Sequence, residues 1–274
     1  KYFLLEEPFP EKNNIWQNQA FQREYLLKKL NYFENNVGGS LALLHEMDFA
    51  KVNCLVFSSS ATVYGDPKEP KCDENANLSP KSIYGKTKLI VEIILSNLKK
   101  KHPKWKIINL RYFNPIGAHP SGLIGEDPVE HPYNLMPIIS QVAVGKRDKV
   151  FIFGNDYNTP DGTCKRDYIH VQDLADGHIA ALKKLLDNHP IKMNINLGTG
   201  KSYSVFEVIK AFEKASSKKI PFQITSRRKG DIGEIYADSN YAKGNLDWNP
   251  KLDINDMCKD TWRWQSKNPD GFKK

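Results

Sequence analysis

Hydrophobic positions along the chain follow two patterns. Short continuous apolar runs rich in β-branched residues are typical of buried strands, and longer segments with apolar residues at helical spacing predict helices. The expected strands are residues 52–57, 105–112, 149–153 and 193–197, and the expected helices are residues 41–47, 80–98, 173–186 and 205–215. Such strands alternating with helices indicate an α/β fold with a doubly wound parallel sheet covered on both faces.

The helix that follows the first strand carries the most informative residues. A serine and a proline at 79–80 are suited to cap and start it. Tyr84 and Lys88 are four residues apart, so they share one face of this helix. We expect the ammonium to pull the pKa of the phenol, ordinarily near 10, toward neutrality. Tyr84 would then serve as a general base or acid.

Other polar residues coincide with the carboxyl ends of the predicted strands. Ser60 follows the first strand, and Phe113 and Asn114 follow the second and open a loop that we expect to continue to Gly125. Ligands of doubly wound sheets bind beyond the carboxyl ends of the strands. The sequence therefore predicts a site in which the hydroxyl of Ser60 bonds a substrate hydroxyl beside Tyr84.

Size, composition and charge argue against several classes of protein. The chain has 274 residues, of which 40% are hydrophobic and 26% are charged, and it carries a net charge of +8. Its lysines are dispersed or gathered at predicted helix ends, where they suit the helix dipole, so we expect no nucleic-acid partner. No apolar run approaches the roughly 20 residues that span a bilayer, so we expect no membrane role. The four cysteines are scattered and the histidines lack ligand spacing, which favours reduced thiols in the cytoplasm and no metal site.

Seven sequence blocks together resemble a known family. They are 35–40 (NNVGGS), 57–66 (FSSSATVYGD), 84–88 (YGKTK), 110–122 (LRYFNPIGAHPSG), 134–137 (NLMP), 161–175 (DGTCKRDYIHVQDLA) and 227–231 (RRKGD). From about residue 28 onward the chain resembles the UDP-glucose (UDP-galactose) 4-epimerase family of the extended short-chain dehydrogenase/reductase superfamily. The resemblance implies a Rossmann-like parallel sheet, a smaller mixed α/β substrate-binding domain, bound NAD, and UDP-galactose and UDP-glucose as substrates.

The resemblance also implies roles for individual residues. Tyr84 would take the proton of the sugar 4-hydroxyl while NAD oxidises C4, Lys88 would hold the nicotinamide ribose, and Ser60 would bridge to the sugar oxygen. Contacts to the cofactor would come from Asn35, Ser60, Tyr84, Lys88 and Phe113. Contacts to the UDP part of the substrate would come from Asn114, Asn134, Leu135, Phe151, Phe153, Arg166, Arg228 and Asp231.

The two residues after Ser60 distinguish between sister enzymes. Sugar-nucleotide dehydratases of this superfamily place an Asp-Glu pair there, which moves a proton at C5. This chain has Ala61 and Thr62, which carry no carboxylate. Hydrogen exchange at C4 alone needs none, so the sequence favours an epimerase over a dehydratase.

Several of these residues also have plain structural interpretations, which the sequence leaves open. Asn35 is suited to cap the next helix, Arg166 to pair with the neighbouring Asp167, and Arg228 to be an ordinary surface side chain.

The same holds for the loop asparagines and the phenylalanines. Asn114 and Asn134 are suited to bond their own backbone. Phe151 and Phe153 alternate with apolar neighbours, so at least one of them is expected in the core.

The opening segment of the family has no recognisable counterpart in residues 1–27. The family begins with a strand, a G-x-G-x-x-G turn and a helix that binds the pyrophosphate, whereas residues 1–27 contain no glycine. We expect a divergent segment 1–27, a partial NAD-binding domain over 28–113, and a mainly UDP-sugar-binding domain over 114–274. The strand at 52–57 should then leave an exposed sheet edge, and the chain alone should bind NAD weakly or not at all.

Three functional hypotheses follow. The first is an NAD-dependent UDP-sugar 4-epimerase that forms homodimers, because the helices near Leu41 and Tyr84 resemble those through which the family pairs. The second is a catalytically impaired relative that keeps UDP binding or a dimer surface, and the third is another UDP-sugar reductase. Ile235 aligns with a residue beside the sugar, and its medium size would also admit UDP-N-acetylhexosamines.

Overall fold

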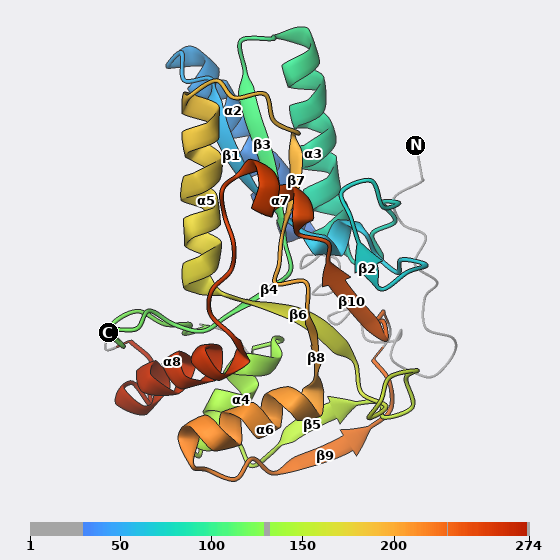
Figure 1. Cartoon of the computed structure of the whole chain (residues 1–274), viewed down its shortest axis with the longest axis vertical. Helices are drawn as coiled ribbons and strands as arrows, with labels where there is room; N and C mark the ends of the chain where they lie inside the picture. The colour runs from blue at the N-terminus through green and yellow to red at the C-terminus, as the bar shows by residue number, and fades with distance from the viewer. Residues whose placement is uncertain (1–29, 129–131, 229, 273–274) are drawn as a thin grey trace.

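The computed structural model describes residues 30–128, 132–228 and 230–272 and shows an elongated molecule built on three sheets (Figure 1). In chain order its elements are η2 (Phe33–Gly38), α2 (Gly39–Phe49), β1 (Cys54–Ser60), η3 (Ala61–Val63), β2 (Lys71–Cys72), α3 (Ile83–Lys101), β3 (Lys106–Tyr112), β4 (Asn114–Ile116), α4 (Leu135–Ala143), β5 (Val150–Phe153), β6 (Lys165–His170), α5 (Val171–Leu186), β7 (Asn194–Leu197), β8 (Ser202–Ser204), α6 (Val205–Ser216), β9 (Phe222–Thr225), β10 (Glu234–Ala237), α7 (Asn240–Asn245) and α8 (Ile254–Lys267).

A parallel sheet in the order β1–β3–β7 lies at one end of the molecule. Helices α2 and α3 cover one of its faces and α5 covers the other (Figure 1). Side chains of β3 alternate accordingly: Ile107 packs with Val91 and Leu95 of α3, and Ile108 and Leu110 join the cluster on the α5 side. The prediction of a parallel sheet covered on both faces is confirmed.

Strand β1 is an edge strand within the described part of the chain, because it pairs with β3 alone. Its side chains from Cys54 to Ser58 are only partly buried, and burial is complete only at Ser59 and Ser60. Among the described residues, the edge of β1 that faces away from β3 therefore has no strand partner. The segment 1–27, which the sequence sets apart, lies outside the described residues.

Two further sheets occupy the other end of the molecule. One has the order β2–β10–β6–β4, with β8 antiparallel to β6, and the other consists of the parallel pair β5–β9. A second core packs between them and helices α4, α6 and α8, with Ile139, Ile152, Phe212 and Met257 at its centre. β2 lies between β1 and α3 in the chain but pairs with β10, so this sheet touches the segment that precedes Tyr84.

The eight elements predicted from periodicity are present, with shifted ends. Helix α3 begins at Ile83 rather than near residue 80, because the side chain of Ser82 caps it by accepting from the backbone N–H of Gly85 at 3.0 Å. Helix α5 begins earlier than expected because the ring of His170 accepts from the backbone N–H of Gln172.

The segment 113–125 was expected to be a loop throughout, and this was wrong for three residues. Asn114–Ile116 forms β4, because β6 presents its backbone from Tyr168 to His170 as a parallel partner. The elements that periodicity did not reveal are mostly short: β2, α4, β6, β8, β9, β10, α7 and α8.

Two further observations concern only the residues in the described ranges. No helix there has the length and apolar character needed to cross a membrane. No group of three or more His, Cys, Asp and Glu side chains there is arranged to bind a metal ion.

Candidate active site

Tyr84 and Lys88 lie in the first turns of α3, beside the end of β1. The Nζ atom of Lys88 donates to the carbonyl of Ser58 at 2.9 Å, and it lies 5.5 Å from the centroid of the Tyr84 ring. Gly85 permits α3 to approach the backbone of η3 closely, since a Cβ atom at residue 85 would lie 2.8 Å from the carbonyl oxygen of Thr62. The structure therefore brings the two residues together on one helix face, as their spacing predicts.

Ser60 is the last residue of β1 and lies near Tyr84. Its hydroxyl accepts from the backbone N–H of Thr62 at 3.2 Å and from the Thr62 hydroxyl at 3.0 Å. Ser60 also lies close enough to Tyr84 to lower the pKa of its phenol. Ser60, Tyr84 and Lys88 thus form one cluster at the carboxyl end of a parallel strand.

The pKa of Tyr84 moves in the opposite direction from the one we expected. Burial and, after it, the neighbouring Tyr112 raise it to about 12, against the smaller effect of Ser60. The ammonium of Lys88, which donates to the Ser58 carbonyl and whose own pKa is lowered by burial, does not reverse this shift. In this structure the phenol of Tyr84 therefore holds its proton at neutral pH and is set to donate.

Asn35 belongs to the π-helix η2, a rare form that is frequent at functional sites. Neither η2 nor α2 has a side-chain cap, so the capping interpretation of Asn35 was wrong. The neighbouring Asn36 donates to the hydroxyl of Thr87 at 2.9 Å, and Thr87 donates to the carbonyl of Tyr84 at 2.8 Å. These bonds fasten η2, which carries Asn35, to the start of α3.

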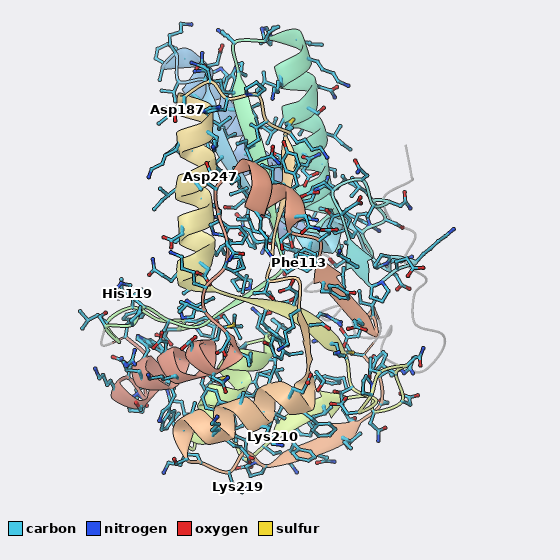
Figure 2. The ribbon with its side chains drawn as sticks, viewed as in Figure 1. Phe113, His119, Asp187, Lys210, Lys219 and Asp247 are labelled. Carbon is cyan, nitrogen blue, oxygen red and sulfur yellow. The ribbon has the colours of Figure 1, made fainter. Side chains whose placement is uncertain are left out.

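Phe113 follows β3 and lies near the middle of the molecule (Figure 2). It is buried in a cluster with Ala61, Tyr64 and Ile235, which joins the end of β1 to β10. Asn114 begins β4, opposite Tyr168 of β6, and is partly buried.

A second cluster gathers residues expected at the UDP part of the substrate. The guanidinium of Arg228 lies 5.3 Å from the centroid of the Phe153 ring and forms an ion pair with Asp231 at 2.9 Å. Arg166 donates to the carbonyl of Ile232 at 2.8 Å, one residue beyond Asp231. Arg228 is exposed, so a surface side chain forms these contacts with Phe153 and Asp231.

The expected ion pair between Arg166 and Asp167 is wrong. Asp167 is buried on the other face of β6, where its carboxylate accepts from the backbone N–H groups of Thr199, Gly200 and Ala237. Successive residues of a strand point to opposite faces, which separates the two side chains.

Phe151 and Phe153 both leave the core, contrary to expectation. They are 50% and 38% exposed, whereas Val150 and Ile152 between them are buried. All four residues belong to β5, so the alternation is real, but the two phenylalanines take the outer face.

Asn134 and Leu135 stand at the start of α4. Asn134 occupies the N-cap position without bonding the helix backbone, so the interpretation that it satisfies its own backbone was wrong. Its side chain lies close enough to Glu126 to lower the pKa of that carboxyl, which partly offsets the rise caused by burial. Leu135 packs against the core of this end of the molecule.

Strand β10 connects the two clusters. Its Ile235 is opposite Arg166 in the register of β6 and β10, and it packs with Ala61 and Phe113 next to the end of β1. Ile235 is buried, so its side chain fills space between the acid–base cluster and the Arg166 strand.

Sequence reasoning missed a buried polar network behind Tyr84, formed by Ser59, Tyr64, Glu92, Arg111 and Asn196. One signal was visible: Glu92 continues the spacing of Tyr84 and Lys88 by another four residues.

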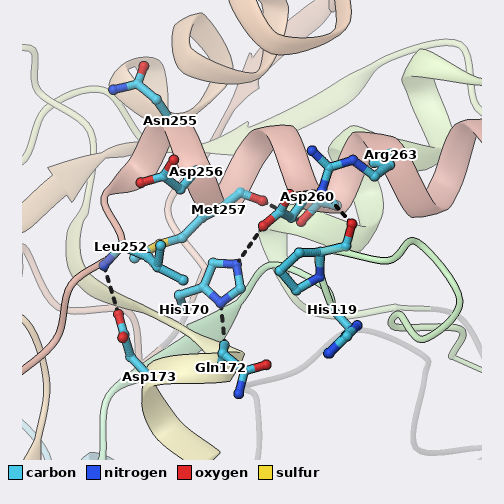
Figure 3. A network of polar contacts seen from close by, with 12 residues as sticks. His119, His170, Gln172, Asp173, Leu252, Asn255, Asp256, Met257, Asp260 and Arg263 are labelled. Atoms are coloured by element: carbon cyan, nitrogen blue, oxygen red, sulfur yellow. Dashed lines mark hydrogen bonds and ion pairs between the residues drawn. The ribbon is translucent and has the colours of Figure 1, made fainter. Parts of the chain in front are cut away.

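It also missed the network around His170, which Figure 3 shows. The Nε2 atom of His170 lies 3.3 Å from the carboxylate of Asp260 on α8, and the Nδ1 atom caps α5. Asp260 also pairs with Arg263. This network joins α8 to the junction of β6 and α5.

Comparison with known proteins agrees with this geometry. The model of the NAD dependent epimerase/dehydratase family matches residues 16–198, beginning before residue 28, where we expected the resemblance to start. The UDP-glucose 4-epimerase of Dictyostelium discoideum is 55% identical over 243 residues, which cover 89% of this chain and 71% of that protein.

Solved structures give the same result. The UDP-glucose-4-epimerase of Stenotrophomonas maltophila, with bound NAD and formylated UDP-arabinopyranose, has a TM-score of 0.86 and 46% identity over 95% of this chain and 75% of its own. The Bifidobacterium longum enzyme, in complex with NAD+ and UDP, has a TM-score of 0.84 and 48% identity over 91% of this chain and 74% of its own. The chain therefore belongs to the NAD-dependent epimerase/dehydratase family, on the branch of the UDP-glucose 4-epimerases.

Proposed function

We propose that this chain interconverts UDP-galactose and UDP-glucose by transient oxidation at the sugar C4, with NAD as its cofactor. The observation that carries the proposal is the cluster of Ser60, Tyr84 and Lys88 at the carboxyl end of β1, fastened to a second cluster by β10. Proton transfer is the only side-chain chemistry that the reaction needs, and a hydroxyl, a phenol and an ammonium suffice for it.

Tyr84 moves the proton of the sugar 4-hydroxyl. Ser60 lies close enough to lower the pKa of this phenol, so a sugar oxygen placed between the two hydroxyls would receive a donor and an acceptor at once. The phenol gives its proton to the oxygen at C4 when the keto sugar is reduced, and it takes the proton back in the reverse step. Ala61 and Thr62 hold no carboxylate beside this point, so no proton is moved at C5.

The residues present fit the nicotinamide half of NAD. Lys88 is partly buried and has donor protons beyond the one that it gives to Ser58, and Asn35 lies on η2 beside the start of α3. We propose that Lys88 holds the nicotinamide ribose, and that Asn35 and Phe113 also contact the cofactor. NAD supplies the reversible oxidation at C4 when it is bound. The expectation that the chain alone binds NAD weakly stays a prediction, and fluorescence titration with NADH tests it.

The UDP part of the substrate would lie against the second cluster. Arg166 and Arg228 supply the positive charge that a diphosphate requires, and Phe153 offers a half-exposed ring face. We propose that these residues, with Asn114, Asn134, Leu135, Phe151 and Asp231, hold the nucleotide. Residues 28–113 would then supply most of the NAD site and residues 114–274 most of the UDP-sugar site.

Ile235 would set the space beside the sugar. Because it is buried between the two clusters, its volume limits what can lie there. We propose that this medium side chain also admits UDP-N-acetylhexosamines, which competition between the two substrate classes tests.

We also propose that two copies pair through α2 and α3. Leu41 and Leu43 of α2 and Ile93 of α3 are exposed apolar side chains, and only Leu44 of α2 is buried. A second copy that presents the same helices would cover them. The four cysteines carry free thiols, which favours a reducing compartment, the cytoplasm.

The decisive experiment is turnover of UDP-galactose by the purified chain with added NAD, followed by coupled detection of UDP-glucose. Tyr84→Phe should lose at least about 100-fold in kcat, because it removes the proton donor and retains the ring. Val171→Ala on α5 is a matched exposed control and should keep the activity. Absence of turnover in the unmodified chain, or net accumulation of NADH, would reject the proposal.

A further inference from the structure

A row of three buried polar residues crosses the main sheet directly behind Ser60. Ser59 on β1 pairs in register with Arg111 on β3, and Arg111 pairs with Asn196 on β7. All three are at most 1% exposed. The next row, which contains Ser60 and Tyr112, is the last of the sheet. On the face of the sheet that packs against α3, a polar row therefore lies next to the strand ends that form the site.

Glu92 fastens this row to helix α3. Its carboxylate accepts from the hydroxyl of Ser59 at 2.5 Å, from Nε of Arg111 at 2.9 Å and from Nη2 of Arg111 at 2.6 Å. Glu92 follows Lys88 by four residues and Tyr84 by eight, so it lies on the same stripe of the helix. The helix that carries the phenol is thus bonded to the strand residue that immediately precedes Ser60.

Arg111 is also held from its other side. Its Nη1 atom donates to the Tyr64 hydroxyl and to the carbonyl of Glu74, both at 3.3 Å, and Tyr64 donates to Asn196 at 2.6 Å. Tyr64 and Glu74 belong to the segment between β1 and α3. The network therefore reaches all three strands, the helix and the segment that connects them.

Stability alone explains such a network poorly. The desolvation of two buried charges largely cancels their attraction, and well-packed apolar residues often serve as well. A bidentate arginine–carboxylate pair differs from apolar packing in its fixed geometry. The apolar contacts of α3, such as those of Val91 and Leu95, restrain its distance from the sheet more than its position along the strands.

We propose that Glu92 and Arg111 are positioning residues for the proposed epimerase reaction, and this inference rests on that proposed function. Acting through Ser59, they fix the start of α3 along β1, so that Tyr84 and Ser60 stand where one sugar oxygen can meet both. They touch neither substrate nor cofactor. Misplacement of an acid–base group by about 1 Å reduces a rate by up to roughly 100-fold, so the effect should be measurable in kcat.

Ser59 allows the mildest test. Ser59→Ala deletes one bond to Glu92 and should lower kcat about tenfold with KM unchanged within about twofold. Ser59→Thr keeps a hydroxyl and should restore most of the loss. Ser140→Ala is the matched control, since Ser140 is also buried and donates to the side chain of Gln265 at 3.0 Å, and it should keep the kcat of the unmodified chain. A Ser59→Ala variant that behaves like the control, or that changes only KM, overturns the proposal.

A double variant separates positioning from charge compensation. Glu92→Met leaves Arg111 buried without its partner, so the melting temperature should fall; Arg111→Met in the same chain should restore most of it. If the pair positions α3, kcat of the double variant stays at least about tenfold low although the fold is recovered. Recovery of kcat together with stability overturns the proposal. If the double variant does not fold, the Ser59 series decides.

Hydrogen exchange distinguishes failure of this inference from failure of the proposed function. The amides of residues 83–92 should exchange several-fold faster in Ser59→Ala than in Ser140→Ala, because α3 loses a bond to β1. This readout needs no turnover. If the unmodified chain does not epimerise, the proposed function fails, and the exchange of α3 still supports or overturns the attachment that we infer.

Discussion

His170 should contribute to stability mainly by capping α5. The side chain is completely buried, and its Nδ1 atom accepts from the backbone N–H of Gln172 at 3.0 Å (Figure 3). The ring fits only because residue 117 is glycine, since a Cβ atom there would lie 2.9 Å from two ring atoms. We therefore choose two substitutions at this position: His170→Ala, which removes both ring and cap, and His170→Asn, which keeps an acceptor.

The magnitudes follow from these contacts. Loss of an N-cap acceptor costs about 1 kcal/mol, and the cavity left by a buried ring costs about 2 kcal/mol more. His170→Ala should then lose about 3 kcal/mol, which is roughly 6–12 °C in Tm for a chain of this size. Asparagine caps helices well, so His170→Asn should be about 1 kcal/mol more stable than His170→Ala.

The same residue should make stability depend on pH. Burial lowers the pKa of His170, and the carboxylate of Asp260 opposes this only in part, since Nε2 lies 3.3 Å away but without hydrogen-bond alignment. The unfolded chain binds a proton near pH 6.5 and the folded chain does not, so stability is full above that pH and declines below it. Between pH 7.5 and 5.5 the decline should approach about 1.4 kcal/mol at most.

Urea unfolding at pH 7.5 and at pH 5.5 measures both effects. The unmodified chain should lose more stability than His170→Asn between the two pH values, because the variant has no imidazole to protonate. Asp260 and Asp173, the carboxylates nearest the ring, are the same in both chains. Equal stability of the Ala and Asn variants would refute the capping argument, and an equal pH response of His170→Asn and the unmodified chain would refute the argument from burial.

Three further predictions concern the proposed site and surface. Arg228→Met should raise KM for UDP-galactose about tenfold with little change in kcat, as steady-state kinetics will show, since it removes a diphosphate partner and leaves the Tyr84 cluster intact. Gly85→Ala should lower kcat in the same assay, because a Cβ 2.8 Å from the Thr62 carbonyl pushes α3 away from η3, the segment that directly follows Ser60; a fully active variant would contradict this. Leu43→Glu should convert a dimer to a monomer in light scattering, and an unchanged mass would exclude the α2 face.

The elements that the sequence predicted are those with a long periodic signal. Helices α2, α3, α5 and α6 were found from apolar residues at helical spacing, and strands β1, β3, β5 and β7 from short runs rich in apolar and β-branched residues. Strands such as β4 and β10 are short, and their existence depends on partners far away in the chain. Asn114–Ile116 is a strand only because Tyr168–His170 lies beside it.

The candidate site was predicted for two different reasons. The pairing of Tyr84 with Lys88 follows from helix geometry alone. The grouping of Phe153, Arg228 and Asp231 came only from family resemblance, since these residues are brought together by the long-range pairing of β5 with β9 and by the turn after it. The direction of the pKa shift of Tyr84 was missed because burial and the neighbouring Tyr112, both set by tertiary packing, outweigh the neighbouring cation.

Strand β10 has a consequence for how a ligand would enter. It is hydrogen-bonded to β2 on one side and to β6 on the other. The segment between Ser60 and α3, which contains β2, therefore belongs to the same sheet as the strand of Arg166. Strands of one sheet move together, so the distance between the Tyr84 cluster and the Arg228 cluster would be set by folding rather than by ligand binding. Selectivity among sugars would then depend on the size of the preformed site. Ligand binding should show no slow kinetic phase from a closing motion.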